Sequence, residues 1–119
     1  IKAELKQAKD LQLSLLPQQL DIEQISEIYG LEVQSHFESS EELAGDYWML
    51  FPVDERLAFV TLDLTGHGVV SALNAVRCHT LMLELQYLLG EPMQFVRALN
   101  ERLVKLLPRG SFATFCMGM

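Results

Sequence analysis

The sequence predicts an α+β fold built around an antiparallel sheet. Strand-like runs gather between residues 31 and 64, whereas helix-like runs gather at residues 1–16 and 69–107. Strands and helices that are segregated along the chain in this way are typical of α+β folds rather than of alternating α/β folds. The chain has 119 residues and is 50% apolar, which is enough for one domain with a packed core.

The first thirty residues predict one helix and a connector. Apolar side chains recur three or four residues apart through residues 1–16, and Pro17 follows, so we expect an amphipathic helix that ends there. The members of this stripe are Ile1, Leu5, Ala8, Leu11 and Leu15. Residues 18–30 are interpreted as a polar connector with a few isoleucines.

Three strands are predicted next. Residues 31–39 alternate apolar and polar side chains, which indicates a half-exposed strand. Residues 46–51 and 56–64 are apolar on both faces, so we expect two central strands covered on both sides. The residues between them, Pro-Val-Asp-Glu, are typical of a turn.

Two helices and a last strand complete the pattern. A long apolar run over residues 69–89 predicts a buried helix, and residues 93–107 predict a second helix with one apolar face. Residues 111–119 begin another strand. Because this strand runs to the end of the given sequence, we expect the domain to be incomplete as given.

Composition narrows the classes of function. The net charge of −7 and the pI of about 4.8 exclude the basic surface that nucleic-acid binding needs. No uninterrupted apolar run reaches the ~18 residues of a membrane span. The two cysteines, Cys78 and Cys116, have no metal-binding spacing, so we expect buried thiols in a reducing compartment and a cytoplasmic location. The acidity suits either simple solubility or a cation site.

The hairpin register predicts a pair of carboxylates. If Asp54 and Glu55 form the tip, then Asp46 lies directly opposite Asp63, on the same face of the sheet. Two carboxylates so placed repel each other unless one is protonated or a cation lies between them, and Mg²⁺ or Mn²⁺ prefers such oxygen ligands. A slip of one residue would place the two side chains on opposite faces.

The loop after Asp63 is a candidate phosphate site. Gly66 and Gly68 permit a tight turn, and the helix that follows would direct its free N–H groups towards a phosphate. His67 would then either bond a phosphate or a water, or shape the loop. The equally acceptable alternative is an ordinary strand-to-helix turn in which Asp63 is a solvent-exposed residue.

Four segments together resemble a known family. In chain order they are LQLSLLP, AGDYW, DLTGHG and ALNERLVKLLPRGSFATF. They resemble the SpoIIE/RsbU-type phosphatases, bacterial relatives of the metal-dependent type 2C (PPM) serine/threonine phosphatases. The resemblance implies an αββα sandwich with two Mn²⁺ or Mg²⁺ ions at one end of the sheets. Asp46 and Asp63 match the family's catalytic metal ligands, and the backbone carbonyl of Leu64 would be a further ligand.

The resemblance also implies a role in signalling. The reaction would be hydrolysis of phosphoserine or phosphothreonine on a partner protein, typically an anti-anti-sigma factor, in the control of sigma-factor activity. Residues 1–17 resemble the family's linker helix, which joins a sensor or receiver domain to the phosphatase and pairs in a homodimer. Residues 18–119 would be the N-terminal part of the phosphatase domain.

The sequence departs from the family pattern at a few positions. Ala44 and Gly45 stand where a glycine pair is usual, and Met49 stands where a second acidic residue is frequent. The family's two other metal-binding aspartates would lie beyond residue 119. The alternative function is therefore a catalytically inactive member that serves as a regulated protein-binding adaptor.

Overall fold

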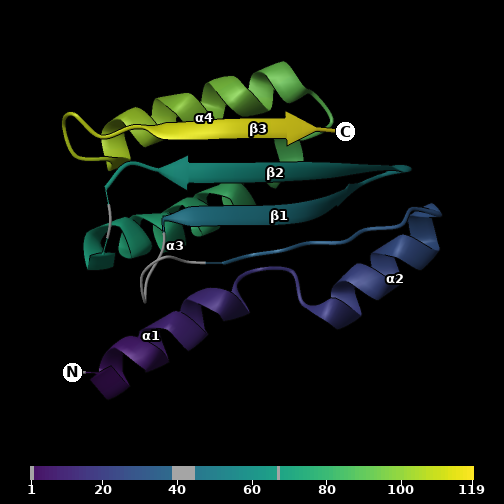
Figure 1. Ribbon diagram of the computed structural model, residues 1–119. Coiled ribbons are helices and arrows are strands. Elements are labelled where there is room, and N and C mark those ends of the chain that lie inside the picture. Colours follow the sequence, from purple (N-terminus) through teal and green to yellow (C-terminus); the bar gives the residue numbers. More distant parts are fainter. Residues whose placement is uncertain (1, 39–44, 67) are drawn as a thin grey trace.

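The computed structural model describes residues 2–38, 45–66 and 68–119. In chain order the elements are α1 (Lys2–Ser14), α2 (Gln19–Tyr29), β1 (Asp46–Val53), β2 (Arg56–Leu64), α3 (Gly68–Leu85), the 3₁₀ helix η1 (Gln86–Leu88), α4 (Pro92–Leu106) and β3 (Ala113–Gly118). The predicted α+β class is confirmed, with helices set against a single antiparallel sheet of order β1-β2-β3 (Figure 1).

The predicted hairpin between β1 and β2 is confirmed together with its register. Val53 pairs with Arg56 next to the turn, and the ladder continues to Asp46 opposite Asp63. Asp54 occupies the turn with a φ of 55°, a left-handed conformation that Asp tolerates better than most residues. The two aspartates therefore lie at the end of the sheet farthest from the turn.

One face of the sheet carries the core. Along β2, alternate side chains are buried beneath α3 and α4, and Phe95 and Leu99 of α4 belong to the same cluster (Figure 1). The buried residues of β2 are Ala58, Val60, Leu62 and Leu64. Burial of this continuous apolar surface is the main stabilising contribution to the fold.

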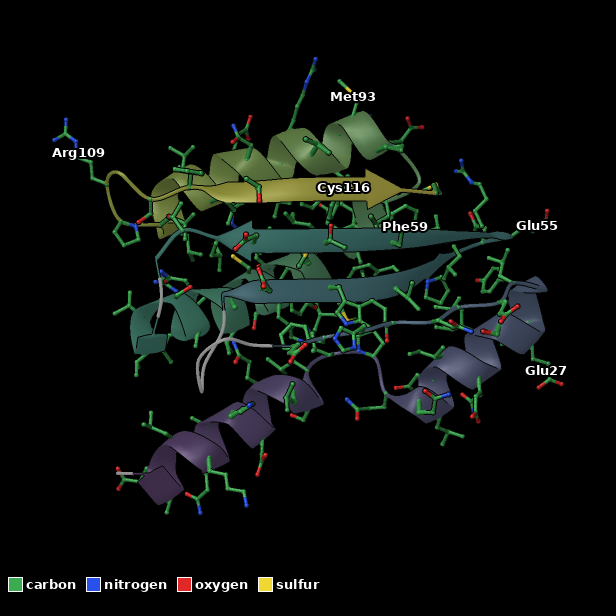
Figure 2. All side chains as sticks on the ribbon, in the orientation of Figure 1. Glu27, Glu55, Phe59, Met93, Arg109 and Cys116 are labelled. Carbon is green, nitrogen blue, oxygen red and sulfur yellow. The ribbon has the colours of Figure 1, made fainter. Side chains whose placement is uncertain are left out.

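The opposite face of the sheet departs from the prediction. Phe59 is 46% exposed, and Thr61 and Asp63 beside it are exposed as well. Figure 2 shows Phe59 on β2 and Cys116 on the neighbouring β3. The prediction that both cysteines are buried is wrong for Cys116, which pairs with Thr61 on this exposed face, whereas Cys78 is buried. We expected these strands to be covered on both sides, but within the described residues helices cover only one side. The described chain therefore supplies one helix layer and one sheet, which is half of an αββα arrangement.

The predicted connector over residues 18–30 is wrong, because α2 forms there. Three apolar side chains spaced by three residues lie along this helix, and the first of them is buried. They are Ile22, Ile25 and Ile28. Gly30, with a φ of 65°, ends α2 in the left-handed conformation that favours glycine at a helix C-terminus.

The predicted strand over residues 31–39 is also wrong for its described part. Residues 31–38 have no regular secondary structure, and residue 39 lies outside the described residues. The segment runs back from α2 towards the start of β1 (Figure 1), and Phe37 packs against the core. The segment is mostly exposed, with only Val33 and Phe37 half-buried, so its alternation of apolar and polar side chains does not come from a ladder of backbone hydrogen bonds.

The terminal helix α1 ends at Ser14, close to the predicted stop at Pro17. Its last turn contacts the core through Leu13 and Leu15, but Leu11 is 66% exposed. The apolar stripe is thus only partly covered by its own chain. No helix among the described residues combines the length and the apolar character needed to cross a bilayer.

The two predicted helices after the hairpin are confirmed with small changes at their ends. The first is α3, which continues as η1. The second is α4, which begins at Pro92. Proline suits this position because the backbone N–H of a first helical residue has no acceptor within the helix. Arg102 of α4 donates to Glu84 of α3 at 2.7 Å, an exposed pair that joins the two helices.

Candidate metal centre

Two carboxylates face each other at the end of the hairpin. Asp46 begins β1 and pairs with Asp63 of β2. The adjacent pair is hydrogen-bonded, because the N–H of Leu64 donates to the carbonyl of Gly45 at 3.1 Å. In an antiparallel ladder the bonded and non-bonded pairs alternate, so Asp46 and Asp63 form a non-bonded pair, in which side chains approach most closely. The hairpin therefore brings together the two predicted site residues.

The electrostatics of this pair favour the uptake of a positive charge. The pKa of Asp46 is raised, first by partial burial and then by its side-chain hydrogen bond to Asp63 and by the charge of that neighbour. A hydrogen bond between two carboxyl groups requires a proton on one of them. A divalent cation can replace that proton and relieve the same repulsion.

The pair opens into a cavity of about 540 Å³ on the uncovered face of the sheet. Its walls come from all three strands and from residues 34–38. Trp48, on the same face of β1 as Asp46, is half-buried and lines this cavity. Among the described lining residues there is no Lys or Arg. An anion such as a phosphate would therefore meet a negative surface unless a cation were bound.

The predicted glycine turn is confirmed, but its place in the site is not. Gly66 and Gly68 have φ angles of 92° and 74°, in the left-handed region that favours glycine. Neither they nor Leu64 line the cavity. The candidate His67 lies outside the described residues.

The loop is fastened to the segment before β3. The N–H of Thr65 donates to the carbonyl of Phe112 at 2.9 Å, and the N–H of Phe112 donates to the Thr65 hydroxyl at 3.0 Å. These two bonds fix the chain directly after Asp63. No sequence pattern indicates this contact, because the two segments are far apart along the chain.

Gly45 allows α3 to approach the start of β1. A Cβ atom at this position would lie 2.1 Å from the Oγ of Ser71 and 3.1 Å from the carbonyl oxygen of Leu64. Ser71 lies near the start of α3 and is 2% exposed, and its hydroxyl has no hydrogen-bond partner among the residues that the structure describes. A side chain at position 45 would displace that hydroxyl or the strand.

The strand that carries Asp46 is also anchored to the middle of α3. The hydroxyl of Tyr47 is hydrogen-bonded to Nδ1 of His79, and the two rings meet edge to face with centroids 5.3 Å apart. Burial raises the pKa of Tyr47 and lowers the pKa of His79, so both side chains are neutral at physiological pH. Sequence reasoning missed this pair, since nothing in the spacing of the two residues links them.

Comparison with known proteins places the chain in a family. The model of the family "Stage II sporulation protein E (SpoIIE)" matches residues 53–119, which is more than half of the chain. The chain belongs to the SpoIIE family. It is also 30% identical over 107 residues to the phosphoserine phosphatase RsbP of Bacillus subtilis (strain 168), an alignment that covers 88% of this chain. The chain spans about a quarter of that relative, 25% of its length. No solved structure matches the chain.

The site of this SpoIIE chain fits the hard divalent cations that the family resemblance implies. The paired carboxylates of Asp46 and Asp63 are the oxygen donors that Mg²⁺ and Mn²⁺ prefer, and the Leu64 carbonyl lies beside the same end of the ladder. No third Asp, Glu, His or Cys forms a ligand cluster with the pair within residues 2–38, 45–66 and 68–119. The described part therefore presents an incomplete set of ligands.

Proposed function

We propose that this chain forms the N-terminal part of a metal-dependent phosphatase domain that removes phosphate from phosphoserine or phosphothreonine of a regulatory partner protein. The partner class that we propose is an anti-anti-sigma factor in bacterial signal transduction in the cytoplasm. Membership of the SpoIIE family and the likeness to a relative named phosphoserine phosphatase support this function. The observation that carries it is the pairing of Asp46 with Asp63 at the edge of an open cavity.

The proposed ligands for Mn²⁺ or Mg²⁺ are the carboxylates of Asp46 and Asp63 and the carbonyl of Leu64. A metal held there would supply two kinds of chemistry, namely neutralisation of charge on phosphate oxygens and a lower pKa for a nearby water. The described lining contains no Lys or Arg, so in this proposal the metal supplies the positive charge that attracts the phosphate.

Other residues of the cavity can orient the phosphate. Thr61 and Thr114 are exposed on the face that carries the carboxylates, and both line the cavity. Thr114 pairs directly with Asp63 in the ladder, so its hydroxyl is placed beside the proposed metal ligand. Hydroxyl groups donate to phosphate oxygens without adding charge. The open position of the cavity on the sheet suits a phosphorylated residue presented by a folded protein.

We propose that α1 transmits a signal to this site from an upstream sensor or receiver domain, within a homodimer. The end of α1 and the helix α2 enclose a second cavity of about 510 Å³ against β1, and His79 of α3 lines it. His79 is hydrogen-bonded to Tyr47, the neighbour of Asp46. A displacement of α1 can therefore reach the carboxylate pair through His79 and Tyr47.

The test uses the full-length protein and a phosphorylated partner, with phosphate release as the readout. Wild-type activity should require Mn²⁺ or Mg²⁺ and disappear with a chelator, and Asp63→Asn should reduce release to the level without enzyme. The matched control is Asp54→Asn at the far hairpin turn, where Asn adopts the left-handed conformation as easily as Asp. Activity that resists both the chelator and Asp63→Asn contradicts the proposal. Partner binding without any release would indicate the adaptor alternative.

A further inference from the structure

The most unusual polar group of the described chain is the hydroxyl of Ser71. It is buried at the start of α3, on the helix side of the sheet, and no hydrogen-bond partner satisfies it. Buried hydroxyl groups without a partner are rare because they lose their bonds to water and gain none in return. Alanine would fill almost the same space without that loss. Packing alone therefore does not explain why this position is a serine.

The position of Ser71 suggests what that role is. Its Oγ and the carbonyl oxygen of Leu64 lie 2.1 Å and 3.1 Å from one point, the place where a side chain on residue 45 would begin. Gly45 has no side-chain atom at this point, to which both oxygens lie close. Gly45 and Leu64 are the residues that adjoin Asp46 and Asp63 in the ladder.

A carbonyl oxygen has two lone pairs, so it can accept a hydrogen bond while it binds a cation. In metal sites, outer hydrogen-bond partners hold the ligands in the direction that the metal requires, and the loss of such a partner lowers metal affinity. A small shift of α3 or of the end of β2 would bring the Ser71 hydroxyl within hydrogen-bonding distance of the Leu64 carbonyl. A cation that fixes the direction of that carbonyl would leave its second lone pair free to accept from the Ser71 hydroxyl, which would then have a partner.

We propose that Ser71 is a positioning residue of the metal centre, donating a hydrogen bond to the Leu64 carbonyl when Mn²⁺ or Mg²⁺ is bound. This inference rests on the proposed function, because it requires the metal. It assigns to Gly45 the complementary role of keeping the space between the two groups clear. It also gives α3 a direct influence on cation affinity through the position of its first turn.

The experiment compares metal affinity with metal-free stability in the full-length protein. Mn²⁺ binding is measured by titration calorimetry for the wild type, for Ser71→Ala and for the control Thr80→Ala, which removes an exposed hydroxyl from the same helix. Ser71→Ala should weaken Mn²⁺ binding about tenfold, the lower end of the effect of outer hydrogen-bond partners on metal sites. Its urea midpoint without metal should equal or exceed that of the wild type. The control should match the wild type in affinity.

Two results would overturn the inference. Wild-type Mn²⁺ affinity in Ser71→Ala would show that the hydroxyl does not position a ligand. A lowered metal-free midpoint in that variant would show that Ser71 stabilises the fold itself. If the wild type binds no Mn²⁺, the metal centre of the proposed function is wrong and this inference falls with it.

Discussion

Asp46→Asn should have opposite effects on stability and on metal binding. Asparagine has the shape of aspartate, and its amide can donate to the Asp63 carboxylate in place of the shared proton. The raised pKa of Asp46 means that its charge is unfavourable in the folded state at neutral pH. The variant should therefore be more stable than the wild type without metal, and it should lose the stabilisation that Mn²⁺ gives to the wild type.

The expected size follows from the geometry of the pair. Side chains directly opposite each other in a ladder have Cβ atoms about 5 Å apart, and two unit charges at that distance repel by about 1 kcal/mol in water and about 3 kcal/mol near a protein surface. Asp46 is exposed, so solvent screening brings the expected gain down to about 0.5–1 kcal/mol. Mn²⁺ at about 100 times its Kd should add about 2.7 kcal/mol to the wild type alone.

The pH dependence gives a second check with a definite sign. A carboxyl group whose pKa is raised by folding holds its proton in the folded state to a higher pH than in the unfolded chain. Its favourable contribution is complete below the unfolded pKa and is lost as the pH rises through the folded value. The advantage of Asp46→Asn should therefore be largest at neutral pH and vanish below a pH of about 4.

Urea unfolding with a chelator, at neutral and acidic pH, measures the difference, and Asp54→Asn at the turn controls for the loss of one negative charge. A variant that is less stable than the wild type at neutral pH, or a difference that does not change with pH, would refute the reasoning about the carboxylate pair.

Three other predictions concern different parts of the fold. Gly45→Ala should destabilise the metal-free protein by about 1–3 kcal/mol, because its methyl group would lie 2.1 Å from the Ser71 oxygen. In urea unfolding, the double variant with Ser71→Ala should recover most of the lost stability. No recovery would show that the clash is not the cause. Cys116 should react with a thiol reagent at a pH of about 8 while Cys78 stays unmodified, because Cys78 is buried and burial raises the pKa of its thiol to about 11; prompt labelling of both in peptide mass spectrometry would contradict the buried position. Leu11→Glu should weaken self-association of the full-length protein without lowering its unfolding midpoint, because this side chain is 66% exposed; an unchanged sedimentation profile would refute pairing through α1.

The carboxylate pair could be predicted from the sequence because the hairpin is local. The turn at Asp54 fixes the register, and each step back along β1 then has one partner on β2. Because side chains alternate between the two faces along each strand, this register also places Asp46 and Asp63 on the same face. The glycine conformations after β2 could be predicted for a similar reason, since a short connection between a strand and a helix restricts the backbone.

The errors arose where local pattern competed with tertiary context. Residues 31–38 have the alternation of a strand, but the structure gives them no ladder. Residues 18–30 seemed too polar for a helix, although three isoleucines at helical spacing were present. The strands β1 and β2 are apolar enough to suggest cover on both faces, yet within the described chain one face carries the open cavity and the segment 34–38 that lines it.

The remaining site features depend on contacts between distant segments. The bonds between Thr65 and Phe112, the contact of Tyr47 with His79 and the approach of Ser71 to Gly45 all join elements whose separation in space the sequence pattern does not encode. Each of these contacts depends on how α3 and β3 pack against the hairpin. Spacing rules predict neighbours within one element and across one turn, but not across a packed interface.

The hairpin that carries Asp46 and Asp63 also bears on how the site forms during folding. Both residues belong to one continuous segment, whereas β3 joins β2 only after α3 and α4 have been traversed. Closing the shorter loop costs less chain entropy, and hairpins form within microseconds. A nascent chain that has emerged only as far as Leu64 thus already holds the two carboxylates on one ribbon. Pulsed hydrogen exchange should show protection in β1 and β2 before β3, and a cation that binds this early would assist folding as well as the later chemistry.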